Sequence, residues 1–228
     1  ALDDAGPGKV ANIRVKIARV AREQLSDVGR ALEELGEALQ VDPMHADAIK
    51  ELESLLESAE EPDHKGQVAE MLEPVYLRQA DWGKLRFALE ARLDNTLDPA
   101  DRGELLTRLG TLYEEQLEDY PAALETAAKR VREEPSDEDI WAEVERLGRV
   151  IGSESEERVA EIFAEALTEV GADDPKTAAL CARTGQLFAA VGDEDKALKW
   201  YRRAYAFTPE SHELFDAIDG LLEGLNQH

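Results

Sequence analysis

The sequence predicts an all-α protein built as a solenoid, a row of similar helical units stacked one on the next. Apolar residues recur at spacings of three and four along nearly the whole chain, as on the buried face of a helix, and alternating strand-like stretches are absent. The chain also aligns with itself after a shift of 92 residues. A fixed-spacing repeat of helices indicates units that cannot bury their own apolar faces and must stack on neighbours.

Twelve helices are expected in order, separated by polar or proline-containing breaks. Their ranges are 9–25, 28–41, 45–60, 64–79, 81–95, 100–117, 120–134, 137–151, 154–170, 175–191, 194–208 and 210–225. Proline lacks a backbone N–H and is tolerated at helix ends, which is where Pro43, Pro62, Pro99, Pro121, Pro135, Pro175 and Pro209 fall. Pro74 is the exception, because it lies inside the fourth range and must either kink that helix or occupy its first turn.

The internal repeat aligns residues 9–55 with 101–147 without a gap. Twelve of these 47 positions are identical, against about three or four expected by chance at this composition. The identities include Glu23-Gln24-Leu25 with Glu115-Gln116-Leu117, Ala31-Leu32-Glu33 with Ala123-Leu124-Glu125, and Pro43 with Pro135.

A third copy, residues 178–211, carries the pattern Cys181, Thr184-Gly185, Phe188, Gly192-Asp193, Ala197, Tyr201, Ala204 and Pro209. This segment resembles the tetratricopeptide repeat (TPR), a hairpin of 34 residues with small residues where its helices cross and aromatic residues between them. Cys181 and Thr184 depart from the Trp and Leu of the TPR pattern. Residues 10–43 and 102–135 follow it more loosely, with one extra residue between the helices.

The resemblance implies a right-handed α-solenoid of about six stacked TPR-like hairpins, a degenerate array of the bacterial type. Residues 1–8, with Gly6, Pro7 and Gly8, are expected to be a flexible lead-in. Residues 9–228 are expected to form a single TPR-like domain. The chain begins at Ala1 rather than at a methionine, which suggests a piece of something longer.

The composition excludes several classes of function. Acidic residues number 51 against 26 basic ones, a net charge of −25, which repels phosphate backbones and argues against a nucleic-acid partner. No segment has the apolar length of a membrane span or the pattern of a secretory signal, so a cytoplasmic protein without membrane insertion is expected. A lone cysteine excludes an intramolecular disulfide framework.

No constellation of residues supports catalysis, a cofactor or a metal site. Cys181 is expected in the core of its repeat, and no two of the four histidines share a metal-ligand spacing. Phosphate-binding loops, nucleophile elbows and calcium loops are absent. Trp200 and Tyr201 are expected in the core, Trp141 between helices, and Trp82 directly after an aspartate that caps its helix. We therefore expect a protein that is not an enzyme.

The charge pattern is uneven, because residues 9–22 carry five basic side chains and no acid. The simpler interpretation is that this helix packs on the acidic second helix, with Glu33, Glu34 and Glu37, or on an upstream repeat. The alternative is a docking surface for an acidic partner or for head-to-tail self-contact.

The TPR resemblance implies a concave groove, lined by the first helix of each hairpin, that binds peptides or partner helices. Carried over by register, the groove positions are Asn12, Val15, Arg19 and Arg22, then Glu104, Thr107, Thr111 and Glu114, then Ala179, Ala182, Gln186 and Ala189. The Lys and Asn that clamp a terminal carboxylate in chaperone-binding members are replaced by Ala182 and Gln186, so that activity is not implied.

The sequence thus predicts a non-enzymatic protein-interaction scaffold that binds a protein or peptide on this groove. A basic partner and self-association both remain open. The alternative is a regulatory or sensor module of a larger multidomain protein whose catalytic part is encoded elsewhere.

Overall fold

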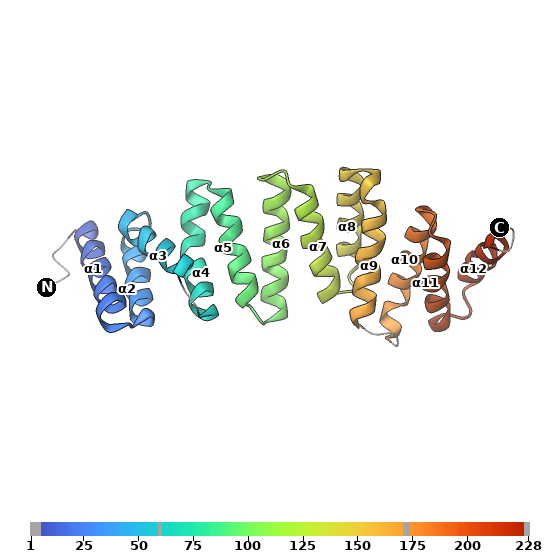
Figure 1. Ribbon diagram of the computed structural model, residues 1–228, viewed down its shortest axis with the longest axis horizontal. Coiled ribbons are helices and arrows are strands. Elements are labelled where there is room, and N and C mark those ends of the chain that lie inside the picture. The colour runs from blue at the N-terminus through green and yellow to red at the C-terminus, as the bar shows by residue number, and fades with distance from the viewer. Residues whose placement is uncertain (1–5, 59–60, 171–173, 226–228) are drawn as a thin grey trace. The chain divides into compact units, whose positions relative to one another are not determined.

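The computed structural model describes residues 6–58, 61–170 and 174–225, which form twelve α-helices, two short 3-10 turns and no β-strand (Figure 1). The helices are α1 (Pro7–Leu25), α2 (Val28–Val41), α3 (Ala46–Ser58), α4 (Pro62–Gln79), α5 (Trp82–Asn95), α6 (Pro99–Glu115), α7 (Tyr120–Glu133), α8 (Glu138–Ile151), α9 (Glu156–Val170), α10 (Ala178–Ala190), α11 (Glu194–Phe207) and α12 (His212–Leu225). The turns are η1 (Ser153–Ser155) and η2 (Pro175–Thr177).

All twelve expected helices are present, and each boundary lies within three residues of the expected one. One difference concerns the expected lead-in, because α1 already begins at Pro7. Proline is well suited to the first turn of a helix, where its missing N–H would have no partner. Residues 1–5 of the expected lead-in lie outside the described residues.

The chain divides into two compact units, residues 1–105 and 106–228, with the division inside α6. The first unit holds α1 to α5, and the second holds α7 to α12. Within each unit consecutive helices contact each other, and α1 also contacts α3, α2 contacts α4 and α7 contacts α9. That the whole of 9–228 behaves as one domain stays a prediction.

Four of the hairpins share one turn design. The turn after the first helix contains a residue with a left-handed backbone, and the next residue is an aspartate whose side chain accepts a hydrogen bond from the N–H three residues on. These pairs are Ser26 and Asp27, Ala80 and Asp81, Glu118 and Asp119, and Gly192 and Asp193. The left-handed residue reverses the chain, and the aspartate caps the second helix, so each turn is built by local chemistry alone.

The turns have the two lengths that the spacing of the repeats predicts. The N–H of Asp27 and that of Asp119 each donate to a carbonyl six residues back, at 2.9 and 2.8 Å. The N–H of Asp193 donates to Phe188, five residues back, at 2.9 Å. The extra residue in the first two copies is therefore accommodated in the turn, and the helices on either side keep their register.

The third copy packs as the TPR pattern requires. Gly185 of α10 lies directly against the ring of Tyr201 of α11, so that an added Cβ would come within 2.8 Å of it. Cys181, Phe188 and Ala197 are buried around this crossing. A close crossing of two helices thus depends on a glycine in one and an aromatic ring in the other.

Pro74 lies in the interior of α4, and the helix continues through it. Leu72, Val75 and Tyr76 on either side of it are buried, and the buried carboxylate of Glu73 pairs with Arg92 of α5. Tertiary packing of these neighbours thus offsets the hydrogen bond that the proline cannot make.

Candidate functional site

Three arginines of the basic helix α1 form ion pairs with glutamates of neighbouring helices. Arg14 forms ion pairs with Glu34, at 2.8 Å, and with Glu37 of α2. Arg19 and Arg22 instead bind Glu51 of α3, at 2.6 and 3.1 Å. The interpretation that this helix packs on the acidic second helix is confirmed for Arg14, whereas Arg19 and Arg22 pair with Glu51 of α3, a partner that the sequence did not indicate.

A similar series of ion pairs links α6, α8 and α10 in the second unit. Glu114 of α6 accepts two hydrogen bonds from Arg146 of α8, at 2.6 and 2.7 Å. Glu145 of α8 in turn accepts from Arg183 of α10, with Arg183 Nε at 2.5 Å. The Arg146 guanidinium lowers the pKa of Glu114 because it hydrogen-bonds the charged carboxylate. We call this surface the α6–α8–α10 row.

The structure places the expected groove residues as follows. Asn12, Glu104, Thr107, Thr111 and Gln186 are exposed, whereas Arg19, Arg22 and Glu114 are half-buried in the ion pairs described above. Gln186 accepts a hydrogen bond from Arg183 at 3.0 Å. The first unit holds Asn12, Arg19, Arg22 and Glu104, and the second holds Thr107, Thr111, Glu114 and Gln186. The structure therefore relates these positions to one another only within each set.

Val15 was expected in the groove, and this prediction is wrong, because its exposed fraction is 2%. It falls in the buried stripe Ala11, Val15 and Ala18, whose spacings of four and three mark the core face of α1. Thr107, at the equivalent position of the second copy, is exposed. The same register position is therefore buried where the side chain is apolar and exposed where it is polar.

A hollow of about 380 Å³ between α8 and α10 was missed by the sequence analysis. Its apolar side chains come from Val159, Leu187, Ala190 and Val191, and polar ones from Glu145, Arg149, Ser153 and Glu156, with Gly148 and Gly152 between them. Glu145 also belongs to the α6–α8–α10 row. This α8–α10 hollow has the mixture of a few polar groups and an apolar lining that is typical of a recognition pocket.

The corner between α8 and α9 shapes this hollow. Gly152 ends α8 with a φ of +112°, a conformation that favours glycine, and the buried Ser155 hydroxyl donates to the Gly148 carbonyl at 2.8 Å. Gly148 has no side chain, and an added Cβ would come within 2.5 Å of Val159 Cγ2. The glycines and the serine thus hold α8 close to α9, and the hollow lies beside this contact.

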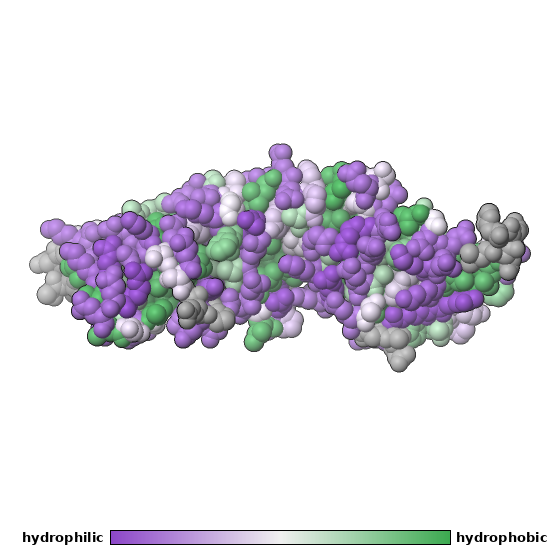
Figure 2. All heavy atoms as spheres, in the orientation of Figure 1, coloured by the Kyte–Doolittle hydropathy of each residue, from purple (hydrophilic) through white to green (hydrophobic). Residues whose placement is uncertain are grey.

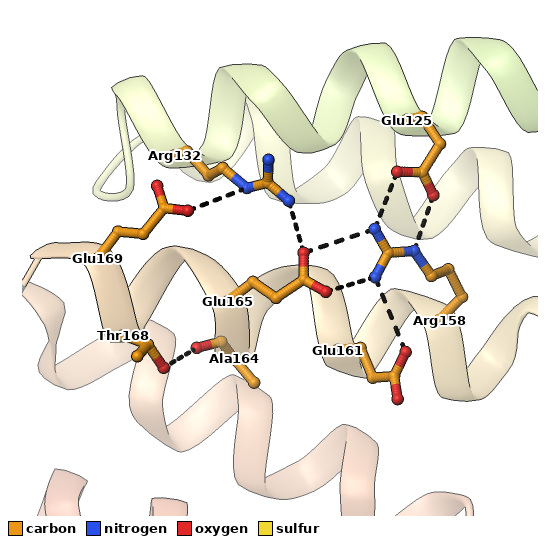
Figure 3. Close-up of polar contacts among 8 residues, drawn as sticks. All are labelled: Glu125, Arg132, Arg158, Glu161, Ala164, Glu165, Thr168 and Glu169. Carbon is orange, nitrogen blue, oxygen red and sulfur yellow. Dashed lines mark hydrogen bonds and ion pairs between the residues drawn. The ribbon is translucent and has the colours of Figure 1, made fainter.

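A second network joins α7 and α9 on their charged surface (Figure 3). Arg158 of α9 binds Glu125 of α7 and Glu165 of its own helix, both at 2.7 Å, and Arg132 of α7 also binds Glu165, at 2.5 Å. Hydrogen bonds from Arg158 lower the pKa of Glu125 and of Glu165. These contacts fasten α7 to α9.

The remaining sequence expectations concern buried and chemically active residues. Cys181 is buried, and burial raises the pKa of its thiol, so it lacks the setting of a reactive cysteine. Trp141, Trp200 and Tyr201 are buried, and Asp81 caps the helix that Trp82 begins. Among the described residues, no group of three or more His, Cys, Asp and Glu side chains is arranged to hold a metal ion.

The surface is largely hydrophilic on the face shown in Figure 2, with separate hydrophobic patches. Within the described residues, none of the helices combines the length and apolar character needed to cross a bilayer.

Comparison with known proteins gives structural neighbours only. No family model matches the chain, and no curated protein matches its sequence. Among solved structures, it is similar to YrrB, described as a TPR protein with an unusual peptide-binding site, at 20% identity and a TM-score of 0.31, covering 92% of this chain and 91% of that one. It is also similar to the C-terminal part of a TPR protein from Cytophaga hutchinsonii, at 13% identity and a TM-score of 0.35, covering 91% and 87%. PilF of Pseudomonas aeruginosa matches at 18% identity and a TM-score of 0.31, covering 93% and 98%.

The described chain is an all-α helical-repeat protein made of TPR-like hairpins. Two features of the chain itself place it in this class. One is the turn that four hairpins share, with a left-handed residue followed by a capping aspartate, and the other is the close crossing of α10 and α11 at Gly185 and Tyr201.

Proposed function

We propose that this protein is a non-enzymatic interaction scaffold that binds a peptide or helix of a partner protein along the α6–α8–α10 row. The α8–α10 hollow carries the proposal, because it offers an apolar lining of Val159, Leu187 and Val191 beside the ion-paired side chains of the row. A preformed pocket on rigid helices avoids the entropy of ordering a loop, so it suits the binding of an apolar anchor side chain.

The rim of the hollow favours a partner with a positive charge beside its anchor. Glu145 and Glu156 both line the hollow, against the single base Arg149. Glu145 is already paired with Arg183, whereas Glu156 is exposed and has no ion-pair partner within the described part of the chain. Because the whole chain carries a charge of −25, a basic segment would also associate faster.

Affinity capture from the native lysate, with bound proteins quantified by mass spectrometry, tests this proposal. The informative variant is Ala190→Arg, which places a long charged side chain at an exposed position of the hollow. Ala190→Ser is the matched control, since it changes the same position without filling the space. We expect a partner that wild type and Ala190→Ser retain equally and that Ala190→Arg loses by about tenfold or more, the equivalent of about 1.4 kcal/mol.

A double variant within the second unit, Thr107→Arg with Thr111→Ala, tests how far the partner extends along the row. It leaves the Glu114–Arg146 ion pair intact, so stability should change by no more than about 0.5 kcal/mol. Loss of the same partner in this variant would extend the site to α6. If every captured protein binds Ala190→Arg as well as wild type, the proposed site is wrong.

A further inference from the structure

Pro74 has a consequence for the surface of the first unit. The residue is exposed, and because it has no N–H, the carbonyl of Glu70 one turn earlier loses its usual helical donor. Glu70 and Pro74 both line a hollow of about 490 Å³ between α2 and α4. The proline thus leaves a backbone acceptor beside a hollow that the α6–α8–α10 row does not include.

The α2–α4 hollow has an apolar base. Leu39 of α2 and Met71 and Val75 of α4 line it, and Gly36 leaves it open from the side of α2. A Cβ added at Gly36 would lie 3.4 Å from Met71 Cε, the flexible end of that side chain. A larger side chain at position 36 would therefore occupy the hollow.

The internal repeat shows what is missing between α2 and α4. By the gap-free alignment, Gly36 corresponds to Ala128 and Gln40 to Arg132 of α7. Arg132 is one of the two arginines that fasten α7 to α9 (Figure 3), whereas no ion pair joins α2 to α4 among the residues that the structure describes. The surface between α2 and α4 in the first unit therefore lacks, among the described residues, the ion pairs that join α7 to α9 in the second.

The two ends of the hollow carry opposite charges. Glu70 and Arg78 both line it, both are exposed, and neither has an ion-pair partner within the described ranges. They are two turns apart on α4, about 12 Å along its axis. At the acidic end, the Glu70 carboxylate and the carbonyl freed by Pro74 provide two acceptors. The exposed side-chain amides of Gln40 and Gln67, which also lack partners in the described chain, complete the rim.

We propose that the α2–α4 hollow is a second docking site, which binds an amphipathic helix of another protein. The helix presents a Leu, Met or Phe to the apolar base, a Lys or Arg to Glu70, and an Asp or Glu to Arg78. A rise of about 1.5 Å per residue sets the spacing of its two charges at seven or eight residues. This site is independent of the proposed α8–α10 site, because it lies in the other unit.

Selection from a phage-displayed library of randomised 20-residue helical peptides on the full chain tests this proposal. Gly36→Leu fills the hollow, and Gly36→Ala is its matched control, since both remove a helical glycine. We expect clones with the stated charge spacing whose affinity falls at least tenfold with Gly36→Leu and is unchanged with Gly36→Ala and Ala190→Arg. Circular dichroism should show both Gly36 variants folded.

The double variant Glu70→Lys with Arg78→Glu tests the direction of the charges without changing any buried residue. It should weaken the selected peptides at least tenfold, and peptides with their acid and base exchanged should regain the loss. The proposal is overturned if no clone depends on Gly36→Leu, or if the charge exchange affects neither set of peptides. Clones that respond only to Ala190→Arg would support the α8–α10 site and refute this one.

Discussion

Replacing Gly185 by alanine tests the helix crossing that defines the TPR-like hairpin. The new Cβ would lie 2.8 Å from Tyr201 Cδ1 and 2.9 Å from Cγ, closer than real Cβ contacts. Tyr201 is itself buried, so its ring cannot move away without disturbing its neighbours. Overpacking of this kind costs about 1–3 kcal/mol, and the helix propensity gained over glycine returns about 1 kcal/mol. The expected net effect is a destabilisation of about 1 kcal/mol.

Gly110→Ala is the matched control, because Gly110 occupies the same motif position in the second copy. Its added Cβ would meet nothing closer than Thr126 Cγ2 and Glu143 Oε1, both at 3.9 Å. Only the propensity gain remains, so this variant should be more stable than wild type by up to about 1 kcal/mol. The same substitution at the same motif position is thus expected to lower the free energy of unfolding in the third copy and to raise it in the second.

Urea unfolding followed by circular dichroism measures both free energies of unfolding. Gly185→Ala should shift the midpoint down and Gly110→Ala should shift it up, with slopes unchanged. In a Tyr201→Leu background the cost of Gly185→Ala should shrink, because the two side chains are coupled by direct contact. If both alanine variants stabilise the protein equally, the crossing is not as tight as described and the argument fails.

Three further outcomes are expected. Cys181 should react with an aromatic disulfide reagent only as fast as the protein opens, because its thiol is buried with a raised pKa; rapid labelling under native conditions would contradict its burial. Arg158 holds the pKa values of the Glu125 and Glu165 carboxylates below their usual 4.5, so these groups add stability above that pH, and the stability is lost as the pH falls through the lowered values. Replacing both by Gln should therefore flatten the fall in Tm below about pH 4.5. A plot of Tm against pH that runs parallel to that of the wild type would argue against the network. Asp119→Ala should cost about 1 kcal/mol in chemical denaturation by removing a helix cap, whereas Asp119→Asn, which can still cap, should cost much less.

The helices were predictable because their signals are local. Apolar spacing and proline positions define each range, and the extra residue in two turns was visible as a longer spacing between matching motif positions of the repeat copies. Pro74 could not be assigned from sequence alone, because its place inside α4 depends on the burial of Leu72 and Val75, which α4 acquires only by packing.

The candidate site was less predictable because it depends on contacts between distant residues. Arg19 meets Glu51, and Arg146 meets Glu114, each across 32 residues, and no local pattern selects these carboxylates among 51 acids. The α8–α10 hollow arises where two helix ends leave space, which composition does not reveal. The glycines at 148 and 152 were the available signal, since a close helix contact and a positive φ each require a small residue.

The central claim is that a partner is held at the α8–α10 hollow of the second unit. Backbone amide chemical shifts of the isotope-labelled chain, recorded during titration with a peptide from the captured partner, test it most directly. We predict the largest changes at Gly148, Gly152, Leu187 and Val191, all of which line the hollow. Changes confined to the first unit, with these four amides unmoved at saturation, would contradict the claim.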